Sequence, residues 1–271
     1  MDGVRLVSGN HKGAAAARNL AFSESAGSFV LYLDADDLIG PNHVELLVAR
    51  LAENGRRVAF GRWERFSKKP AGAQVSEPEH YRDMPGIEWL CRDWIDGAPM
   101  VQCGMFLIPR TLIEAHGGWD ERLSLLDDVE FFSRIIGKSD GLAYAPHACL
   151  HYRSDVPGSL SRQVSRAAYE SAVMSCLLAV EHLISAEDSI RTRTACANIL
   201  QAFEYQFYPM FSDLSAKVRA RIVELGGSDL EPHGPPVFHL LRRWIGWRSA
   251  RRIQQLANGI SQLASARPNE A

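Results

Sequence analysis

The fold class is decided by the stretch Phe29-Val30-Leu31-Tyr32-Leu33-Asp34-Ala35-Asp36-Asp37. Its five consecutive apolar residues have the length of a strand that is buried on both faces, as strands of parallel sheets are. The run then ends abruptly in acidic residues. Because side chains two apart share a face in extended chain, Asp34 and Asp36 can converge while Asp37 points elsewhere or begins a turn.

Predicted strands and helices alternate around this stretch. We expect strands at residues 4–7, 58–60, 102–108 and 142–151, and helices at 14–25, after Pro41 and from Thr111. This alternation predicts α/β architecture with a largely parallel sheet. From residue 165 to 225 the periodicity is helical. We therefore expect two parts, residues 1–163 with the sheet and an α-helical C-terminal region at 164–271.

Composition excludes some classes of function. The 271 residues include 30 basic and 32 acidic side chains, so a formal charge of −2 favours no nucleic-acid partner. Five cysteines without a CxxC pair argue against a disulfide framework and a structural zinc site, and favour a reducing, cytoplasmic location. We see no leader-like segment and no run near the ~18 apolar residues of a membrane span.

Residues 238–263 interleave leucines, isoleucines and tryptophans with five arginines. This pattern predicts a basic amphipathic helix or helix pair. Such a helix either packs on the preceding helices or docks on a membrane surface, and both alternatives stay open. The second would make the protein peripheral at the inner membrane surface.

The acids at the end of the first stretch suggest a metal site. Ligands of open α/β sheets bind at the carboxyl ends of strands, and hard carboxylates suit Mg²⁺ or Mn²⁺. The alternative is a solvated turn before the helix at Pro41, since aspartate is a common turn residue.

The order of motifs resembles the family-2 group of GT-A glycosyltransferases, which show an Ala-Arg-Asn helix followed by an apolar strand ending in Asp-x-Asp-Asp. Arg18-Asn19 and Asp34-Ala35-Asp36-Asp37 stand in that order here. The resemblance implies that Asp36 contacts the metal and the diphosphate, and that Asp34 contacts the sugar or ribose. It places Arg18 near the nucleotide, although a solvent-facing arginine is the ordinary alternative.

A second element is Gly117-Gly118-Trp119-Asp120-Glu121, followed by Leu125-Leu126-Asp127-Asp128-Val129-Glu130. It is similar to the family's Gly-aromatic-Asp-Glu stretch and its downstream Glu-Asp pair, with Asp127 in place of the usual Glu. The resemblance makes Asp128 the catalytic base and puts Trp119 and Asp127 on the acceptor side. Alternatively, Asp127 and Glu130 form a capping box and Trp119 is part of the core.

The third element runs from His151-Tyr152-Arg153 to Arg162 and resembles the family segment that closes over the diphosphate. Asp155 stands where histidine is usual, and an acid would repel phosphate. The leaving-group contacts are therefore assigned to Arg153 and Arg162. His151 is a candidate metal ligand or a structural histidine.

Family members open with strands and a helix that supply much of the nucleotide pocket, and none precedes Val4. We therefore expect a GT-A sheet that lacks its first strands. Three explanations stay open: Met1 is an internal start in a longer frame, which we favour, another chain complements this one, or the gene is a decaying fragment.

The expected function is inverting transfer of a sugar from a nucleotide-diphosphate sugar, with a UDP-sugar as the expected donor, to a glycan, lipid or other hydroxyl acceptor. The expected cofactor is Mg²⁺ or Mn²⁺. The rival is a truncated, catalytically impaired remnant or partner subunit that acts by protein association. A nucleotidyltransferase ranks third, since no Gly-rich phosphate loop lies near the N-terminus.

Overall fold

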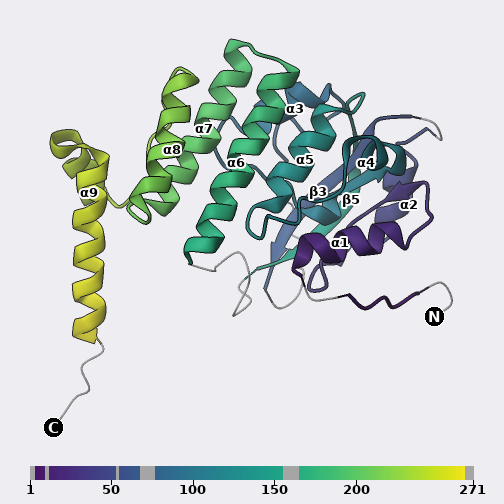
Figure 1. Ribbon diagram of the computed structural model, residues 1–271, viewed down its shortest axis with the longest axis horizontal. Coiled ribbons are helices and arrows are strands. Elements are labelled where there is room, and N and C mark those ends of the chain that lie inside the picture. The colour runs from purple at the N-terminus through teal and green to yellow at the C-terminus, as the bar shows by residue number, and fades with distance from the viewer. Residues whose placement is uncertain (1–3, 10–11, 53–54, 68–76, 155–164, 266–271) are drawn as a thin grey trace, which may run out of the picture.

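The computed structural model describes residues 4–9, 12–52, 55–67, 77–154 and 165–265, without the side chains of 258–265 (Figure 1). The elements, in chain order, are α1 (Ala14–Ser23), β1 (Phe29–Val30), β2 (Leu38–Ile39), α2 (His43–Val48), β3 (Val58–Phe66), α3 (Gly86–Asp93), the 3-10 turn η1 (Cys103–Met105), β4 (Phe106–Pro109), α4 (Arg110–His116), α5 (Asp127–Gly137), β5 (Leu142–Arg153), α6 (Arg166–Ala186), α7 (Ile190–Phe207), α8 (Ser212–Glu224) and α9 (Pro236–Ser265).

The strands form one mixed sheet in the order β1-β4-β3-β5-β2. Only β3 and β5 run parallel among the described strands, whereas the β1–β4, β3–β4 and β2–β5 pairs are antiparallel. The prediction of a largely parallel sheet is therefore wrong, although the α/β class is confirmed. Local patterns predict a strand but not its neighbour, because pairing is a long-range contact.

Two predicted strands are shorter or absent. Only Phe29 and Val30 of the decisive apolar run pair, and they pair antiparallel with β4 at the end of the sheet. Residues 4–9 form no strand, and the side chain of Leu6 is 92% exposed. The helix after Pro41 is also short, and of its apolar side chains Leu47 is buried while Val44 and Val48 are exposed.

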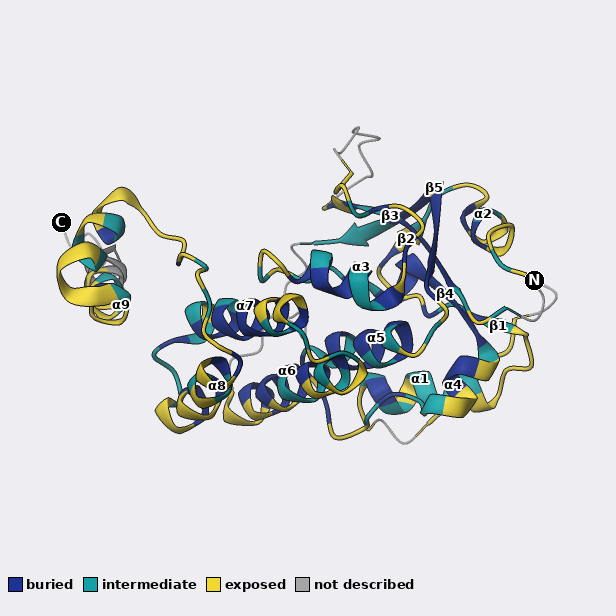
Figure 2. Cartoon of the chain, turned by 90° about the horizontal axis from the view of Figure 1, so that it is seen from above, coloured by how far each residue is buried: buried dark blue, intermediate teal, exposed yellow. Residues whose placement is uncertain are grey.

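The two faces of the sheet are covered differently (Figures 1 and 2). On one face α2 covers a small cluster that includes Leu47, Ala59 and Leu107. The other face contributes to a large cluster that joins Phe60 and Phe106 in the sheet to helices as distant as α8. The helical region thus shares its core with the sheet. The predicted domain boundary at residue 163 lies outside the described residues.

Helices α6, α7 and α8 confirm the predicted helical periodicity, and side-chain caps fix where two of them begin. The Ser165 hydroxyl accepts from the Ala168 N–H at the start of α6, and Ser189 with Thr192 makes a capping box at the start of α7. In the described part of the chain, α6 alone is long and apolar enough to cross a membrane by length and composition. Because 56% of its apolar window is buried, we interpret α6 as a core helix.

All five cysteines are buried and unpaired, as the odd number and scattered positions predicted. They lie in five different elements, and burial raises the pKa of every one of these thiols.

Candidate functional site

The acidic run forms a turn tied to the end of β5. The Asp37 N–H donates to the Asp34 carbonyl over 3.1 Å, and buried Asp37 accepts the Arg153 N–H over 2.8 Å. The Arg153 Nε donates to the carbonyl of Asp36 over 2.7 Å. Burial, followed by the charges of Asp34 and Asp36, raises the pKa of Asp37 to about 6. The turn therefore holds three carboxylates close enough to repel one another.

Arg18 joins this run to the second motif. Its Nη2 donates to Asp34 Oδ1 over 2.8 Å, and its Nη1 donates to Asp127 Oδ2 over 2.9 Å. The side chain of Arg18 is 16% exposed, that of Asp127 15% and that of Asp34 41%. The alternative of a solvent-facing arginine is thereby excluded. Contact of Arg18 with a nucleotide remains a prediction, since both ends of its guanidinium already bind carboxylates.

Asn19 and Trp119 lock α1 to the loop before α5. The Asn19 side-chain amide donates to the Trp119 carbonyl over 2.9 Å and accepts the Trp119 N–H over 2.8 Å. The indole is 3% exposed and stacks on Phe131 with ring centroids 4.1 Å apart, while the Arg18 guanidinium lies 4.4 Å from its centre. This burial favours the core alternative for Trp119 over a platform under an acceptor sugar.

Asp127 and Asp128 begin α5 without capping it. No side chain caps this helix end, where Leu126 adopts a left-handed conformation with φ 58°. Asp128 Oδ1 accepts the adjacent Val129 N–H over 2.8 Å. Burial, followed by the charge of Asp127, raises the pKa of Asp128 to about 7, and burial raises that of Asp127 against the opposing effect of Arg18. A carboxyl with this pKa can accept a proton near neutral pH.

The predicted capping box is wrong because Glu130 has other partners. Its carboxylate accepts from Arg134 Nε over 2.7 Å and lies 2.9 Å from His182 Nε2 on α6. Arg134 also donates to the carbonyls of His116, Gly117 and Gly118. Glu130 therefore fixes α5 against α6 and, through Arg134, the turn that leads to Trp119.

His151 pairs with a residue that the sequence analysis missed. Its Nδ1 lies 2.6 Å from an oxygen of buried Glu64, which stands opposite it on the parallel β3–β5 pair. Ligand atoms of Glu64, Cys149 and His151 all lie within 4.8 Å of one another, and in the described part of the chain no such group includes Asp36. An acid inside the otherwise mostly apolar strand β3 was the one available clue. Metal binding by His151 together with Asp36 remains a prediction.

The donor set of the acidic run fits a hard divalent ion. Asp36 is exposed, and the neighbouring carboxylates raise the pKa of Asp37, so a cation here would relieve their repulsion. Magnesium-like ions take only one or two protein carboxylates and complete their coordination with water and phosphate oxygens. Asp36 alone, or with one neighbour, would be sufficient.

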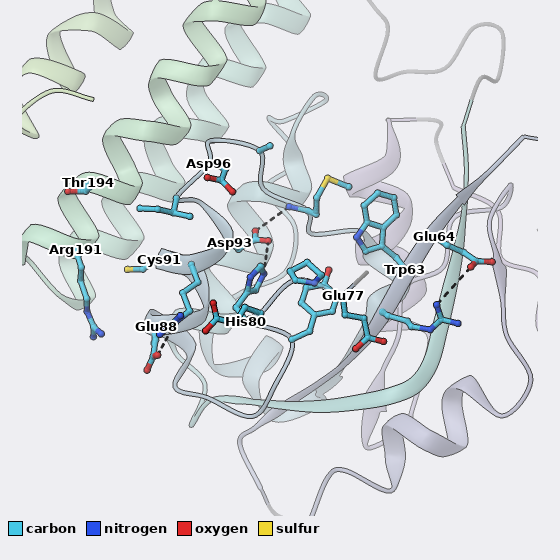
Figure 3. A pocket seen from close by; sticks show the side chains of 18 of the residues that line it. Trp63, Glu64, Glu77, His80, Glu88, Cys91, Asp93, Asp96, Arg191 and Thr194 are labelled. Atoms are coloured by element: carbon cyan, nitrogen blue, oxygen red, sulfur yellow. Dashed lines mark hydrogen bonds and ion pairs between the residues drawn. The ribbon is translucent and has the colours of Figure 1, made fainter. Parts of the chain in front are cut away.

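A pocket of about 1120 Å³ lies beside β3, α3 and the start of α7, and Figure 3 shows Trp63 and Glu64 at one end and Arg191 and Thr194 at the other. It opens because β4 pairs with β3 only at Ala59 and Phe60, which leaves that edge of β3 without a described strand beside residues 62–65. None of the predicted site residues that the structure describes lines it. The sequence analysis missed this pocket, since it depends on where β4 ends.

Tyr152 contacts one wall of the pocket and is influenced by the charges of two acidic residues. Its ring contacts that of Trp63, with centroids 6.2 Å apart. Burial raises the pKa of its hydroxyl, and the charges of Asp37 and Asp128 raise it further. The tyrosine therefore lies within the field of both carboxylates while it touches the pocket wall.

Most of the predicted residues thus gather around two centres. Arg18, Asp34, Asp127 and Asp128 form one, with Trp119 packed beneath; Asp36, Arg153 and His151 lie along the contact of the acidic run with β2 and β5. Arg162 lies outside the described residues. The individual roles of these residues remain predictions.

Comparisons with known proteins show which proteins the chain is similar to. Residues 2–117 match the family described as Glycosyl transferase family 2. Over 62 residues the chain is 32% identical to the E. coli protein UDP-Glc:alpha-D-GlcNAc-diphosphoundecaprenol beta-1,3-glucosyltransferase WfgD, a match that covers 22% of this chain and 24% of that protein. The predicted resemblance to family-2 glycosyltransferases is confirmed by these matches.

Solved structures confirm the fold. The S. aureus TarS fragment 1–349 in complex with UDP-GlcNAc matches with a TM-score of 0.57 at 12% identity, over 81% of this chain and 63% of that one. Another structure of this fragment matches with a TM-score of 0.53 at 14% identity, over 79% and 60%. The chain therefore spans less than two thirds of these similar structures and about a quarter of the E. coli relative. The GT-A architecture followed by a helical region is confirmed.

Proposed function

We propose that the chain transfers a sugar from a nucleotide-diphosphate sugar to a hydroxyl acceptor, with inversion at the anomeric carbon. The observation that carries the proposal is Asp128, whose pKa is raised to about 7 in a site where Arg18 connects its neighbour Asp127 with the acidic run. The family match over residues 2–117, which includes the acidic run, supports the same reaction class.

Asp128 acts as the general base. The acceptor oxygen attacks the anomeric carbon, the bond from that carbon to the diphosphate oxygen breaks, and the hydroxyl proton passes to the Asp128 carboxylate. An alcohol becomes acidic only as it attacks, so a base with a pKa near the working pH is suited to the step. The Val129 N–H, 2.8 Å from Asp128 Oδ1, holds one carboxylate oxygen in place.

The donor is a UDP-sugar that binds along the acidic run. The named E. coli relative uses UDP-Glc, and the similar TarS fragment was solved with UDP-GlcNAc. Asp34 contacts the sugar or ribose and Arg153 the diphosphate. Asp36 would hold Mg²⁺ or Mn²⁺, which when bound supplies positive charge for the departing diphosphate.

The acceptor occupies the pocket beside Trp63. The contact of Trp63 with Tyr152, the neighbour of Arg153 on β5, supports this assignment. The half-buried Trp63 ring offers an apolar surface, and Glu77, Glu79 and Asp96 on the lining offer carboxylates to hydroxyl groups. This combination suits a saccharide acceptor.

The test is UDP release from UDP-glucose and UDP-N-acetylglucosamine, with Mg²⁺, with Mn²⁺ and with EDTA, in the presence of saccharide acceptors. We expect Asp128→Asn to lower turnover by the ~10²–10⁴-fold that a general base contributes, while UDP still binds in calorimetry. Asp36→Ala should weaken metal-dependent UDP binding. Asp140→Asn, at a carboxylate 65% exposed, is the matched control and should change neither.

If the Asp128 and Asp36 variants turned over the donor as fast as the parent protein does, these roles would be refuted. Absence of UDP binding, together with stable association with another protein, would favour the alternative of a non-catalytic partner subunit.

A further inference from the structure

Helix α9 lies at the end of the molecule farthest from the sheet in both views, and Figure 2 shows that much of its surface is exposed. It consists of two helical segments, because Gly246 leaves the helical conformation with φ 74° and ψ 157°. The predicted basic amphipathic helix pair is therefore present, and the two segments can present different sides.

The second segment is attached to the end of α7. The Trp247 ring contacts those of Tyr205 and Tyr208, with centroids 4.6 and 5.1 Å apart. Arg248 Nη2 lies 3.0 Å from an oxygen of Glu204, whose side chain is 0% exposed. These contacts hold α9 on the protein without using its most apolar side.

Phe238 of α9 is buried, but several other described apolar side chains of this helix are exposed. Val237, Leu240 and Trp244 are 66%, 60% and 84% exposed and follow each other at helical spacing, which puts them on one side of the first segment. Ile253 and Leu256, which are 45% and 69% exposed, likewise lie on one side of the second segment. A soluble domain rarely leaves such a series exposed without a partner.

The charge of α9 has one sign. Residues 236–265 contain five arginines and no acid or lysine, so the other residues together carry a formal charge of −7. Arg242, Arg248 and Arg251 form hydrogen bonds with groups of the protein itself, whereas Arg243 and Arg252 are exposed. The Arg252 guanidinium also lies 5.6 Å from the centre of the Tyr208 ring. The partner of this surface must accept both apolar side chains and positive charge.

We propose that α9 docks the protein on an anionic lipid surface, with the exposed apolar side chains in the acyl boundary and Arg243 and Arg252 among the lipid headgroups. A second copy would set arginines against arginines. Nucleic acid would leave Val237, Leu240 and Leu256 exposed. An anionic lipid surface, such as the cytoplasmic leaflet, satisfies both features.

The full chain should be sedimented with vesicles of phosphatidylcholine alone and with vesicles containing phosphatidylglycerol. We expect binding to the anionic vesicles only, weakening as salt is added. Arg243→Gln and Arg252→Gln should each lower the affinity about fivefold, the effect of one basic residue near a charged membrane. Trp244→Ser should lower it about tenfold through lost apolar burial.

The matched controls are Ile190→Ser and Val223→Ser, which remove side chains 86% and 76% exposed elsewhere on the helical region and should bind as the parent does. A second measurement is tryptophan fluorescence. Trp244 is 84% exposed, whereas Trp63 and Trp247 are half-buried and the other three tryptophans are buried, so Trp244 should dominate a blue shift on adding anionic vesicles. Trp244→Phe should remove most of that shift while the protein still sediments.

Several results would overturn the proposal: equal binding to neutral vesicles, unchanged binding in the Arg243 and Trp244 variants, or RNA binding that competes with the vesicles. A dimer in solution that Trp244→Ser dissociates would instead assign the surface to a second copy. None of these measurements requires a nucleotide-sugar, so their outcome is separate from that of the proposed transfer.

Discussion

Replacing Asp128 with asparagine should stabilise the protein above neutral pH while it removes the proposed base. The pKa of Asp128 is raised from its ordinary 3.8 to about 7, so the folded protein binds this proton more tightly than the unfolded chain does. At about 1.4 kcal/mol per pKa unit, ionising the carboxyl in the folded state costs at most about 4 kcal/mol. Because the side chain is only half-buried, solvent reduces the expected value to about 2 kcal/mol.

The sign follows from linkage. The free-energy cost of ionising Asp128 in the folded protein is absent below the unfolded pKa near 4. It grows as pH rises and is complete above pH ~7. Urea unfolding followed by tryptophan fluorescence should therefore give nearly equal free energies of unfolding for parent and Asp128→Asn at pH 4, with the variant about 2 kcal/mol more stable at pH 8. Asp140→Asn serves again as the control, with no pH-dependent difference.

A stability difference that does not change between pH 4 and pH 8 would refute the account of Asp128 as a carboxyl whose ionisation is disfavoured by its surroundings. A variant that is less stable at pH 8 would show that the ionised carboxylate makes favourable contacts in the folded protein. The proposed role as base would then lose its main support.

Two further predictions concern packing and charge. Arg18→Met should destabilise the fold by about 2–3 kcal/mol in urea unfolding, since it leaves a partly buried carboxylate unpaired. In double-mutant cycles the coupling of Arg18 to Asp127 should exceed that to the more exposed Asp34, and the reverse order would contradict the burial argument. Gly86→Ala should destabilise by several kcal/mol, because its Cβ would collide with a backbone carbonyl of α5, whereas Gly137→Ala, whose nearest neighbour across the same contact is 3.8 Å away, should be tolerated. Equal melting temperatures for the two glycine variants would refute the predicted collision.

The sequence predicted the class of fold better than the pairing of the strands. Apolar runs located the start of β3 and most of β5, and helical periodicity located the region that contains α6 to α8, because these patterns are local. They did not predict the antiparallel pairing of Phe29 and Val30, which depends on a strand almost eighty residues away. The mixed sheet is the result of such pairings.

In the candidate site, too, local motifs were predicted correctly and several long-range contacts were missed. Motif order brought Arg18 together with Asp34 and Asp127, and the structure joins them by hydrogen bonds. The capping box at Asp127 failed because Glu130 is engaged by Arg134 and His182, and His182 lies on a helix about fifty residues further along the chain. The pairing of Glu64 was missed because it depends on which residue β3 faces on β5, and the pocket was missed because it depends on where β4 ends.

The five unpaired cysteines can report on local opening of the core. Each lies in a different element, from α3 and η1 through β5 to α6 and α7, and each thiol is shielded and held protonated by burial. A thiol reagent can therefore react only when the surrounding element opens. Labelling rates measured cysteine by cysteine would show whether the sheet and the helices behind it open together or in sequence, without any mutation.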